Sequence, residues 1–556
     1  MSSRKARRQR KGRRDGGTKG RSGIRNPQSA IVKSGGRFAA PMGPDTGRPD
    51  GNPPDPYDGR RMSGGPWMVM RMNPLLALAA ALLVHGPVIG PGTSEVHAAE
   101  LASQIEGLLR SVPASTVEYG VAVVDAENGR LVFSRNAEQP LIPASNQKLL
   151  VMAAGLELLG RRFEFRTVLG LRRGDLVIIG DGDPAIGDPK LCEPTGDGVL
   201  AMFHGWARAL LNNGHTSIPG DLIIDESIFD EQLVHPSWEA ADVQKWYGAP
   251  VGALNLHDNC IEVTVWPATQ PGDAALWSVT PPATIVEIIN RVRSGGAGVP
   301  VIAGSGEPFR FILSGSCGSR AALEPVPAPD PGLLFADVFR GVLESAGFGV
   351  AGELRRERVR TRQGALPGDI EIIAVHRTPI GDVLTRIGKD SQNLFAECLA
   401  KRIGYEHMRR TSGAPARGSW VTASSAVQAF GRRIGMDTSG MVFADASGLS
   451  RDNRVTAGQF VDLLVYMFRR GDRDIFMESL AVPGKEGSLR KRMRGLEGSV
   501  LAKTGTLRGV KSLSGYVRSD GRTYAFSIIF NGYQGPSAPY KRIQDQFCRL
   551  LAAHSE

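Results

Sequence analysis

Three short motifs along this chain carry side chains that could perform acyl transfer. The first places a serine and a lysine three residues apart, at Ser145 and Lys148, and the second places a serine two residues before an amide, at Ser391 and Asn393. The third is a cationic segment of four residues: Lys503, Thr504, Gly505 and Thr506. A serine hydroxyl becomes an effective nucleophile when a neighbouring base accepts its proton, and a lysine amine can be that base. The motifs therefore predict a serine acyltransferase that works without histidine.

The residues that follow Ser145 predict a buried helix. Apolar side chains dominate residues 149–159, and Gly160 then provides a stop. Residues three apart share a helix face, so we expect Lys148 to reach the hydroxyl of Ser145. Burial removes water from a lysine, which lowers its pKa and lets it act as a base. In the alternative interpretation, Ser145 only caps the helix and Lys148 is solvated.

The second motif lies in a predicted connection between two helices. Helical stretches at 380–387 and 394–403 flank Ser391 and Asn393. A polar pair in such a connection can face a cleft, although a serine or asparagine before a helix is otherwise a cap. The order of the three motifs, each in a suitable element, favours the catalytic interpretation.

The third motif lies beside a predicted β-hairpin. Residues 503–506 precede two β-rich runs that are joined by Asp520 and Gly521, and a second hairpin is predicted around residues 128–129. Hairpins at both ends of the chain, with helices between them, predict an α+β fold whose one antiparallel sheet is closed by the two chain ends. Gly505 would let another backbone, such as a peptide substrate, approach the strand closely.

The segment around the first motif, residues 143–150, resembles the nucleophile segment of the D-alanyl-D-alanine carboxypeptidase/endopeptidase family. These are the class C low-molecular-mass penicillin-binding proteins, serine peptidase family S13. The departures from the family pattern are small, an Asp-Ala-Ser at 445–447 and a Gly-Ser at 487–488, and both lie outside the three motifs. The similarity runs from about residue 100 to the C-terminus and includes the segments Ile179–Pro184, Tyr247–Leu254, Asp258–Asn259, Ser391–Glu397, Asp445–Ser450 and Ala502–Leu507.

The resemblance implies a serine β-lactamase/transpeptidase-like fold. That fold is a five-stranded antiparallel sheet flanked by helices, here with a large insertion between the first two motifs. We expect residues 99–162 and 371–556 to form the catalytic domain and residues 163–370 to form one or two inserted domains. Within the insertion, residues 221–225 are expected to form a hairpin-like strand.

The resemblance also implies a role for each motif residue. Lys148 would accept the proton of Ser145, and Asn393 would orient Lys148 and the substrate amide. Ser391, between the lysines of the first and third motifs, would relay a proton toward the leaving amine. Backbone N–H groups of Ser145 and Thr506 would form the oxyanion hole. The terminal carboxylate of the substrate would be bound by the third motif, through Lys503, Thr504 and Thr506.

The N-terminal region predicts a basic tail and a secretory signal. Residues 1–61 hold 16 Lys/Arg and 5 Asp/Glu, so the rest of the chain is formally neutral and gives no indication of nucleic acid as a partner. Residues 1–67 are expected to be disordered, or to reflect a start codon assigned too far upstream. An apolar core at 74–84 and a Val-x-Ala site at 96–98 predict a signal peptide over 68–98. The mature chain is therefore expected to be exported to the periplasm or beyond, with at most peripheral membrane association.

The cysteines, histidines and acidic clusters predict neither a metal site nor a cofactor. The histidines show no paired spacing with acids. Cys398 and Cys548 lie in apolar helical patterns and are expected in the core, while a disulfide is left open among Cys192, Cys260 and Cys317. A solvated turn, not a calcium loop, is expected for Asp181, Asp183 and Asp188.

These observations predict a serine-type D-Ala-D-Ala carboxypeptidase or DD-endopeptidase that cuts peptidoglycan peptides through an acyl-enzyme on Ser145. Peptidoglycan peptides and β-lactams are the expected partners. One alternative is a serine β-lactamase or esterase of the same fold, but the glutamate loop that class A β-lactamases use for deacylation has no counterpart before residue 503. A second alternative is a non-catalytic peptidoglycan-binding protein, which would have no need of Ser145, Lys148 and Lys503 together.

Overall fold

The computed structural model describes residues 93–113, 115–192, 198–412 and 416–554. The predicted tail, and the predicted signal peptide as far as residue 92, lie outside the described residues. Helix α1 (Thr93–Leu109) runs through the predicted cleavage site after Ala98, so cleavage there stays a prediction. Within the described ranges, no helix is both long and apolar enough to cross a lipid bilayer.

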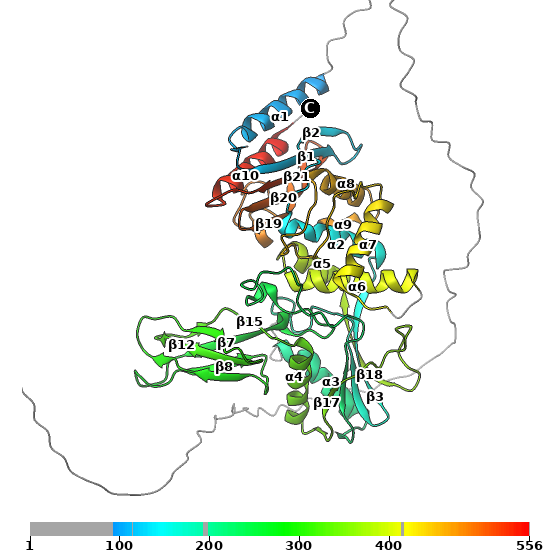
Figure 1. The fold of residues 1–556 in the computed structure, drawn as a ribbon, viewed down its shortest axis with the longest axis vertical. Coiled ribbons are helices and arrows are strands. Elements are labelled where there is room, and N and C mark those ends of the chain that lie inside the picture. The colour runs from blue at the N-terminus through cyan, green and yellow to red at the C-terminus, as the bar shows by residue number, and fades with distance from the viewer. Residues whose placement is uncertain (1–92, 114, 193–197, 413–415, 555–556) are drawn as a thin grey trace, which may run out of the picture. The chain divides into compact units, whose positions relative to one another are not determined.

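The main sheet is antiparallel and unites strands from both ends of the chain (Figure 1). β1 pairs with β21 along its whole length, with Glu118 opposite Asn531. The predicted five-stranded sheet is confirmed, and so are the hairpins at 128–129 and 520–521. In the order β19-β20-β21-β1-β2, the strands span Val500–Leu507, Val510–Ser519, Arg522–Asn531, Glu118–Asp125 and Leu131–Arg135.

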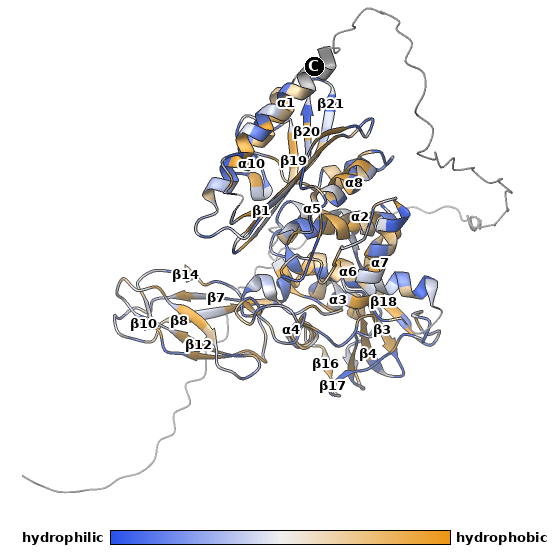
Figure 2. Ribbon diagram, turned by 45° about the horizontal axis from the view of Figure 1, so that its top comes forward, coloured by the Kyte–Doolittle hydropathy of each residue, from blue (hydrophilic) through white to orange (hydrophobic). Residues whose placement is uncertain are grey.

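Helices cover both faces of this sheet. Apolar side chains such as Phe526 and Phe547 fill the space between the sheet and α1 and α10, and Tyr516 and Ile529 point to the opposite, α8 side. The orange of α2 and α8 in Figure 2 marks the apolar packing on that second side. Besides α1, these helices are α10 (Ala538–Ala553), α8 (Ala457–Phe468) and α2 (Lys148–Leu158).

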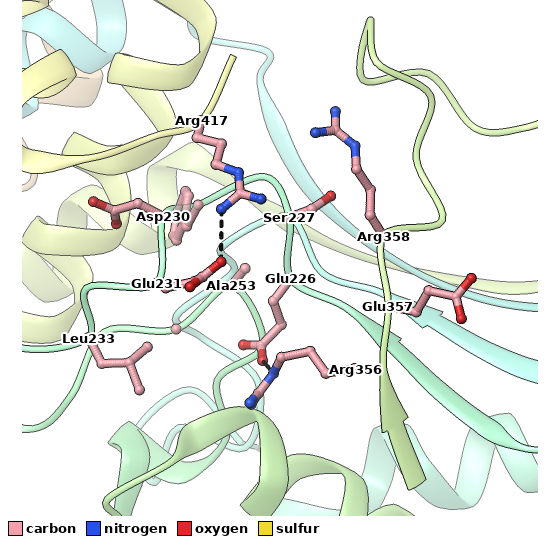
Figure 3. A pocket seen from close by; sticks show the side chains of 12 residues that line it. Glu226, Ser227, Asp230, Glu231, Leu233, Ala253, Arg356, Glu357, Arg358 and Arg417 are labelled. Carbon is pink, nitrogen blue, oxygen red and sulfur yellow. Dashed lines mark hydrogen bonds and ion pairs between the residues drawn. The ribbon is translucent and has the colours of Figure 1, made fainter. Parts of the chain in front are cut away.

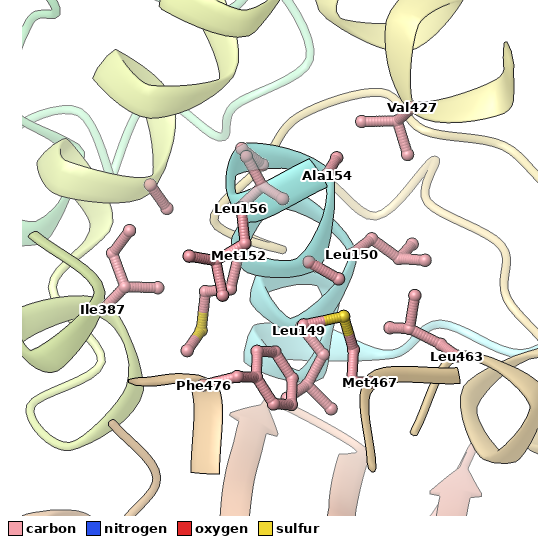
Figure 4. Packing of buried hydrophobic residues seen from close by; sticks show 14 of the residues in the cluster. Leu149, Leu150, Met152, Ala154, Leu156, Ile387, Val427, Leu463, Met467 and Phe476 are labelled. Carbon is pink, nitrogen blue, oxygen red and sulfur yellow. The ribbon is translucent and has the colours of Figure 1, made fainter. Parts of the chain in front are cut away.

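Helix α2 is the centre of the helical layer. All of its residues from Lys148 to Leu156 are buried, and Figure 4 shows Leu149 beside Phe476 and Met467. A 3-10 turn over Ala144–Gln147 precedes the helix, so Ser145 lies in this tighter turn and not in the predicted first helical turn. Four further helices complete the layer, α5 (Ile380–Gly388), α6 (Asn393–Thr411), α7 (Trp420–Arg433) and α9 (Arg473–Met477). The helices predicted on either side of Ser391 are thus present.

The region between the first two motifs builds a second sheet, in the order β17-β6-β4-β3-β18. β6 (Leu222–Asp225) pairs parallel with both β4 and β17, so this segment is an interior strand of a mixed sheet and the expected hairpin is absent there. β18 pairs with β3, and we therefore propose that the inserted region ends near Pro379 and not at residue 370. The strands span Leu354–Arg356, Leu222–Asp225, Asp175–Ile179, Glu164–Arg172 and Glu371–Pro379, and the helices packed with them are α3 (Ala201–Asn212) and α4 (Pro331–Ser345).

Short strands make up the rest of the inserted region. They are β5 (Ser217–Ile218), β7 (Cys260–Trp266), β8 (Leu276–Thr280), β9 (Glu287–Asn290), β10 (Arg293–Ser294), β11 (Val301–Gly304), β12 (Arg310–Ser314), β13 (Ser316–Cys317), β14 (Ala321–Ala322), β15 (Val326–Pro327) and β16 (Gly349–Val350).

All five cysteines of the chain are free, so no disulfide forms among Cys192, Cys260 and Cys317. Cys398 and Cys548 are buried, as expected.

Candidate active site

The turn that carries Ser145 is held in a strained backbone conformation by close neighbours. Ala144 has a φ of +47°, a left-handed value that costs a non-glycine residue about 1–3 kcal/mol. A Cβ atom on Gly448 would lie 1.9 Å from the Ala144 carbonyl oxygen, and one on Gly505 would lie 2.8 Å from that of Pro143. The backbone that closely approaches Gly505 is therefore the turn that carries Ser145. The sequence had suggested a peptide substrate in this position.

Lys148 is fully buried and contacts three groups. Its Nζ lies 3.2 Å from Ser145 Oγ, and it donates to Asn393 Oδ1 at 2.7 Å and to the Ser447 carbonyl oxygen at 2.6 Å. Burial lowers the pKa of Lys148 to about 7, against the opposing charges of Glu397 and Asp445. A neutral amine has two N–H groups and one lone pair, so the two short contacts leave the lone pair for the Ser145 proton. The solvated alternative for Lys148 is wrong.

Two buried carboxylates fix the turn that presents the Ser447 carbonyl. Glu397 accepts hydrogen bonds from the backbone N–H groups of Ala446 and Ser447, at 3.1 and 2.7 Å, and from Trp420 Nε1 at 2.8 Å. Burial, and then the charge of Asp445, raise the pKa of Glu397 to about 7. Sequence reasoning noted Glu397 and Asp445 only as parts of family-like segments. The spacing of Glu397 from Asn393, one helical turn, was the available signal.

Asp445 completes this support from within the turn. Its carboxylate accepts from the N–H groups of Gly448 and Ser450, at 2.9 and 2.7 Å. It also accepts from Asn453 Nδ2 at 2.7 Å and from the indole of Trp238, a residue of the inserted region, at 2.8 Å. The inserted region therefore helps to shape the turn that holds Lys148.

The second motif contacts both lysines of the site through different residues. Ser391 has a φ of +62°, and its Oγ accepts a hydrogen bond from Lys503 Nζ at 2.7 Å. Asn393 bridges Lys148 and the carbonyl oxygen of Tyr247, to which its Nδ2 donates at 2.8 Å. Ser391 was expected between the two lysines, but the hydrogen bonds of the described residues join it to Lys503 alone. The helix-cap alternative is wrong, because the side chain of Gln392 takes that position.

The third motif occupies β19, the edge strand of the main sheet. Lys503 is fully buried, and burial, together with the nearby charges of Lys148 and Lys511, holds its pKa well below the ordinary value. The hydroxyl of Thr504 donates to Ser488 Oγ at 2.8 Å, and that of Thr506 accepts from Lys511. An edge strand keeps one row of backbone groups free of sheet partners, which a peptide can use. All eight predicted site residues are thus gathered around the Ser145 turn and β19.

The acidic group at 181–188 is a buried network and not the solvated turn that was expected. Asp183 is unexposed and accepts from Thr378 Oγ1 at 2.6 Å, and burial raises its pKa. Asp188 is also unexposed and accepts from Arg386 at 2.7 Å. In the part of the chain that the structure describes, no group of three or more His, Cys, Asp or Glu residues is placed to hold a metal ion.

A separate cavity of about 300 Å³ lies outside this site (Figure 3). Its lining is strongly charged, and two of its arginines are paired with two of its acids. Arg356 donates to Glu226 at 2.9 Å, and Arg417 donates to Glu231 at 3.1 Å. None of the eight predicted site residues lines it, and we assign it no part in the chemistry.

A serine beside a buried amine, next to the edge strand of an antiparallel sheet, defines the class of serine enzymes that transfer acyl groups without histidine. Comparison with known proteins narrows this class. The chain belongs to the D-Ala-D-Ala carboxypeptidase 3 (S13) family, whose model matches residues 101–554. It is a serine peptidase, and the resemblance found in the sequence is confirmed.

Two relatives and one solved structure illustrate the similarity. The D-alanyl-D-alanine carboxypeptidase of Actinomadura sp. (strain R39) is 33% identical over 538 residues, which cover 90% of this chain and 94% of the relative. The D-alanyl-D-alanine carboxypeptidase DacB of Haemophilus influenzae is 24% identical over 447 residues, which cover 74% of this chain and 85% of the relative. The crystal structure of penicillin binding protein 4 (dacB) from H. influenzae matches with a TM-score of 0.67 at 22% identity, covering 81% of this chain and 99% of that one. The expected fold is thereby confirmed.

Proposed function

We propose that this chain is a serine-type D-Ala-D-Ala carboxypeptidase or DD-endopeptidase that acts on peptidoglycan stem peptides or cross-links. The observation that carries the proposal is the buried amine of Lys148, 3.2 Å from Ser145 Oγ, whose pKa burial lowers to about 7, where its neutral form can act as the base. The family of the chain and the activity named for the Actinomadura relative support the same reaction. A H. influenzae penicillin binding protein 4 structure that holds a β-lactam supports acylation by penicillins.

The acylation step follows from the positions of the side chains. Lys148 takes the Ser145 proton as the serine oxygen attacks the carbonyl carbon of the D-Ala-D-Ala bond. Backbone N–H groups of Ser145 and Thr506 bind the oxyanion that forms. The C–N bond then breaks, and the leaving amine takes the proton of the Ser391 hydroxyl, which Lys503 replaces through its hydrogen bond to Ser391 Oγ, while Lys148 keeps the Ser145 proton until the ester is cleaved. Water finally cleaves the ester on Ser145 and releases the shortened peptide.

The third motif supplies recognition of the substrate's C-terminal carboxylate. Lys503, Thr504 and Thr506 stand along the edge strand where such a carboxylate would lie. In the free enzyme, burial and the nearby cations disfavour the charged form of Lys503. An arriving carboxylate favours that charged form, so substrate binding and protonation of Lys503 reinforce each other.

The substrate also requires export. Peptidoglycan lies outside the cytoplasmic membrane, and the predicted signal peptide at 68–98 provides the means of crossing it. We propose that the mature enzyme works in the periplasm or outside the cell, with at most peripheral membrane association, and that its catalytic domain has no nucleic-acid partner.

Three assays on one preparation test the proposed reaction. Purified chain without residues 1–98 is incubated with fluorescent penicillin, with a D-Ala-D-Ala peptide and with a chromogenic cephalosporin. We expect a covalent fluorescent adduct, released D-alanine and only slow cephalosporin turnover. Rapid cephalosporin turnover without D-alanine release would identify a β-lactamase. If neither the covalent adduct nor released D-alanine is observed, the chain is a non-catalytic binding protein.

A further inference from the structure

Arg386, at the end of α5, links the inserted region to the loop that carries Ser391. The residue is 4% exposed, and its guanidinium donates to one oxygen of Asp188, through Nε at 3.0 Å and through a terminal nitrogen at 2.7 Å. The other terminal nitrogen donates to Asp390 at 2.7 Å. The guanidinium also lies 5.3 Å from the ring centre of Phe395, in the first turn of α6. This one side chain of α5 thus contacts the inserted region, the loop and the first turn of α6.

Arg386 holds the residues on both sides of Ser391. Its side chain binds Asp390, and its carbonyl oxygen accepts from the backbone N–H of Gln392 at 3.2 Å. A serine with a φ of +62° is strained, and such a conformation persists only where the surrounding contacts enforce it. These two contacts fix the backbone on either side of the strained residue.

The inserted region in turn holds Arg386 and Asp390. Asp188 is unexposed, and its second oxygen accepts from the backbone N–H groups of Lys190 and Leu191, at 2.8 and 2.9 Å. The ammonium of Lys190, which is 58% exposed, binds Asp390 directly. A third carboxylate, that of Asp258, lies 3.5 Å from Arg386, so the cluster gathers three acids around two cations.

We propose that Arg386 and Asp390 are positioning residues for Ser391, and that Asp188 and Lys190 of the inserted region hold them in place. The inference rests on the proposed function, because it takes Ser391 as the proton relay. It gives the inserted region an indirect part in catalysis, because that region helps to set the position of the hydroxyl that must meet Lys503. A structural anchor alone would affect stability and leave the acylation step untouched.

The test separates positioning from stability with Asp390→Asn, which keeps the size of the side chain and removes its charge. The rate constant of acylation by penicillin and the dissociation constant of the preceding complex are measured by stopped flow. Amide hydrogen exchange of residues 389–393 is measured on the same protein. We expect acylation to slow about tenfold with less than about a twofold change in the dissociation constant, and exchange at 389–393 to accelerate. Asp382→Asn, at the start of the same helix, is the matched control.

A second pair of variants probes the contact from the inserted region. Lys190 is exposed, so Lys190→Met does not threaten the core, and Lys190→Arg keeps the charge. We expect Lys190→Met to slow acylation about threefold and Lys190→Arg to restore it. Acylation at the wild-type rate in both Asp390→Asn and Lys190→Met, even with a lowered melting temperature, overturns the proposal. If penicillin fails to acylate the wild type, the proposed function is wrong. The inference about Arg386 and Asp390 is then tested by hydrogen exchange alone, and unchanged amide exchange of residues 389–393 in Asp390→Asn overturns it.

Discussion

The amine of Lys148 lies 2.6 Å from the carbonyl oxygen of Ser447, a residue 299 positions further along the chain. That carbonyl is a fixed acceptor, because buried Glu397 binds the N–H of the same residue at 2.7 Å. The bond to Ser447 and the bond to Asn393 together occupy the two N–H groups of a neutral lysine. The turn at 445–450 therefore orients the base as well as surrounding it.

Replacing the nucleophile should remove all covalent chemistry. We expect Ser145→Ala to abolish labelling by fluorescent penicillin and release of D-alanine while the circular dichroism spectrum stays unchanged. Ser345→Ala, which alters a hydroxyl at the end of α4, serves as the control and should label normally. Labelling that persists in purified Ser145→Ala protein would place the nucleophile elsewhere.

The rate of acylation should rise with pH as Lys148 loses its proton. Burial lowers the pKa of Lys148 to about 7, so the neutral base predominates above that pH and is lost below it. Lys148→Arg keeps a charge that cannot be removed, and we expect it to slow acylation about 1,000-fold at every pH. Stopped-flow measurements between pH 5 and 9 check both statements. An arginine variant that acylates at close to the wild-type rate would show that lysine serves only as a cation.

Glu397 should make stability depend on pH in the acidic range. Burial raises its pKa from 4.5 to about 7, so the folded state binds a proton more tightly than the unfolded state does. The stability that this provides is fully present below about pH 4.5 and is lost as the pH rises through about 7. We expect the difference in free energy of unfolding between the wild type and Glu397→Gln to shrink from pH 5 to pH 7, measured with urea. Glu344→Gln, on the surface of α4, should show no such trend.

The close approach at Gly505 should not tolerate a methyl group. A Cβ there would meet Ser512 Oγ at 2.1 Å and the Pro143 carbonyl oxygen at 2.8 Å, which forces the Ser145 turn away from β19. We expect Gly505→Ala to slow acylation about 100-fold, since a displacement of about 1 Å has that effect on a reacting group. Gly498→Ala has open space around its Cβ and should leave the rate unchanged.

Export should remove the N-terminal region. We expect a mature N-terminus within a few residues of Ala99 and unaltered activity after deletion of residues 1–69. Edman sequencing of the protein from its native host decides the point. A mature chain that still begins before Arg61 would mean an uncleaved, anchored form.

Short-range patterns in the sequence predicted the parts of the fold that depend on neighbouring residues. The apolar run after Ser145 predicted a buried helix, and the Asp-Gly pair at 520–521 predicted a hairpin, because both depend on local propensity. The 3-10 turn at Ser145 could not be predicted, since Gly448 and Gly505 shape it from more than 300 residues away. The acids at 181–188 were misplaced for the same reason, because Thr378, the partner of Asp183, and Arg386, the partner of Asp188, come from elements about 200 residues further along the chain.

The pairing of β1 with β21 has a consequence for how the enzyme becomes active. The chain leaves the ribosome N-terminus first, so Glu118 and its neighbours must wait for Asn531 and the last strands before the sheet can close. Until β19 arrives, Ser145 and Lys148 have no strand beside them. A nascent or stalled chain therefore carries Ser145 and Lys148 without the strand that completes the site, and hydrolytic activity appears only when synthesis is complete.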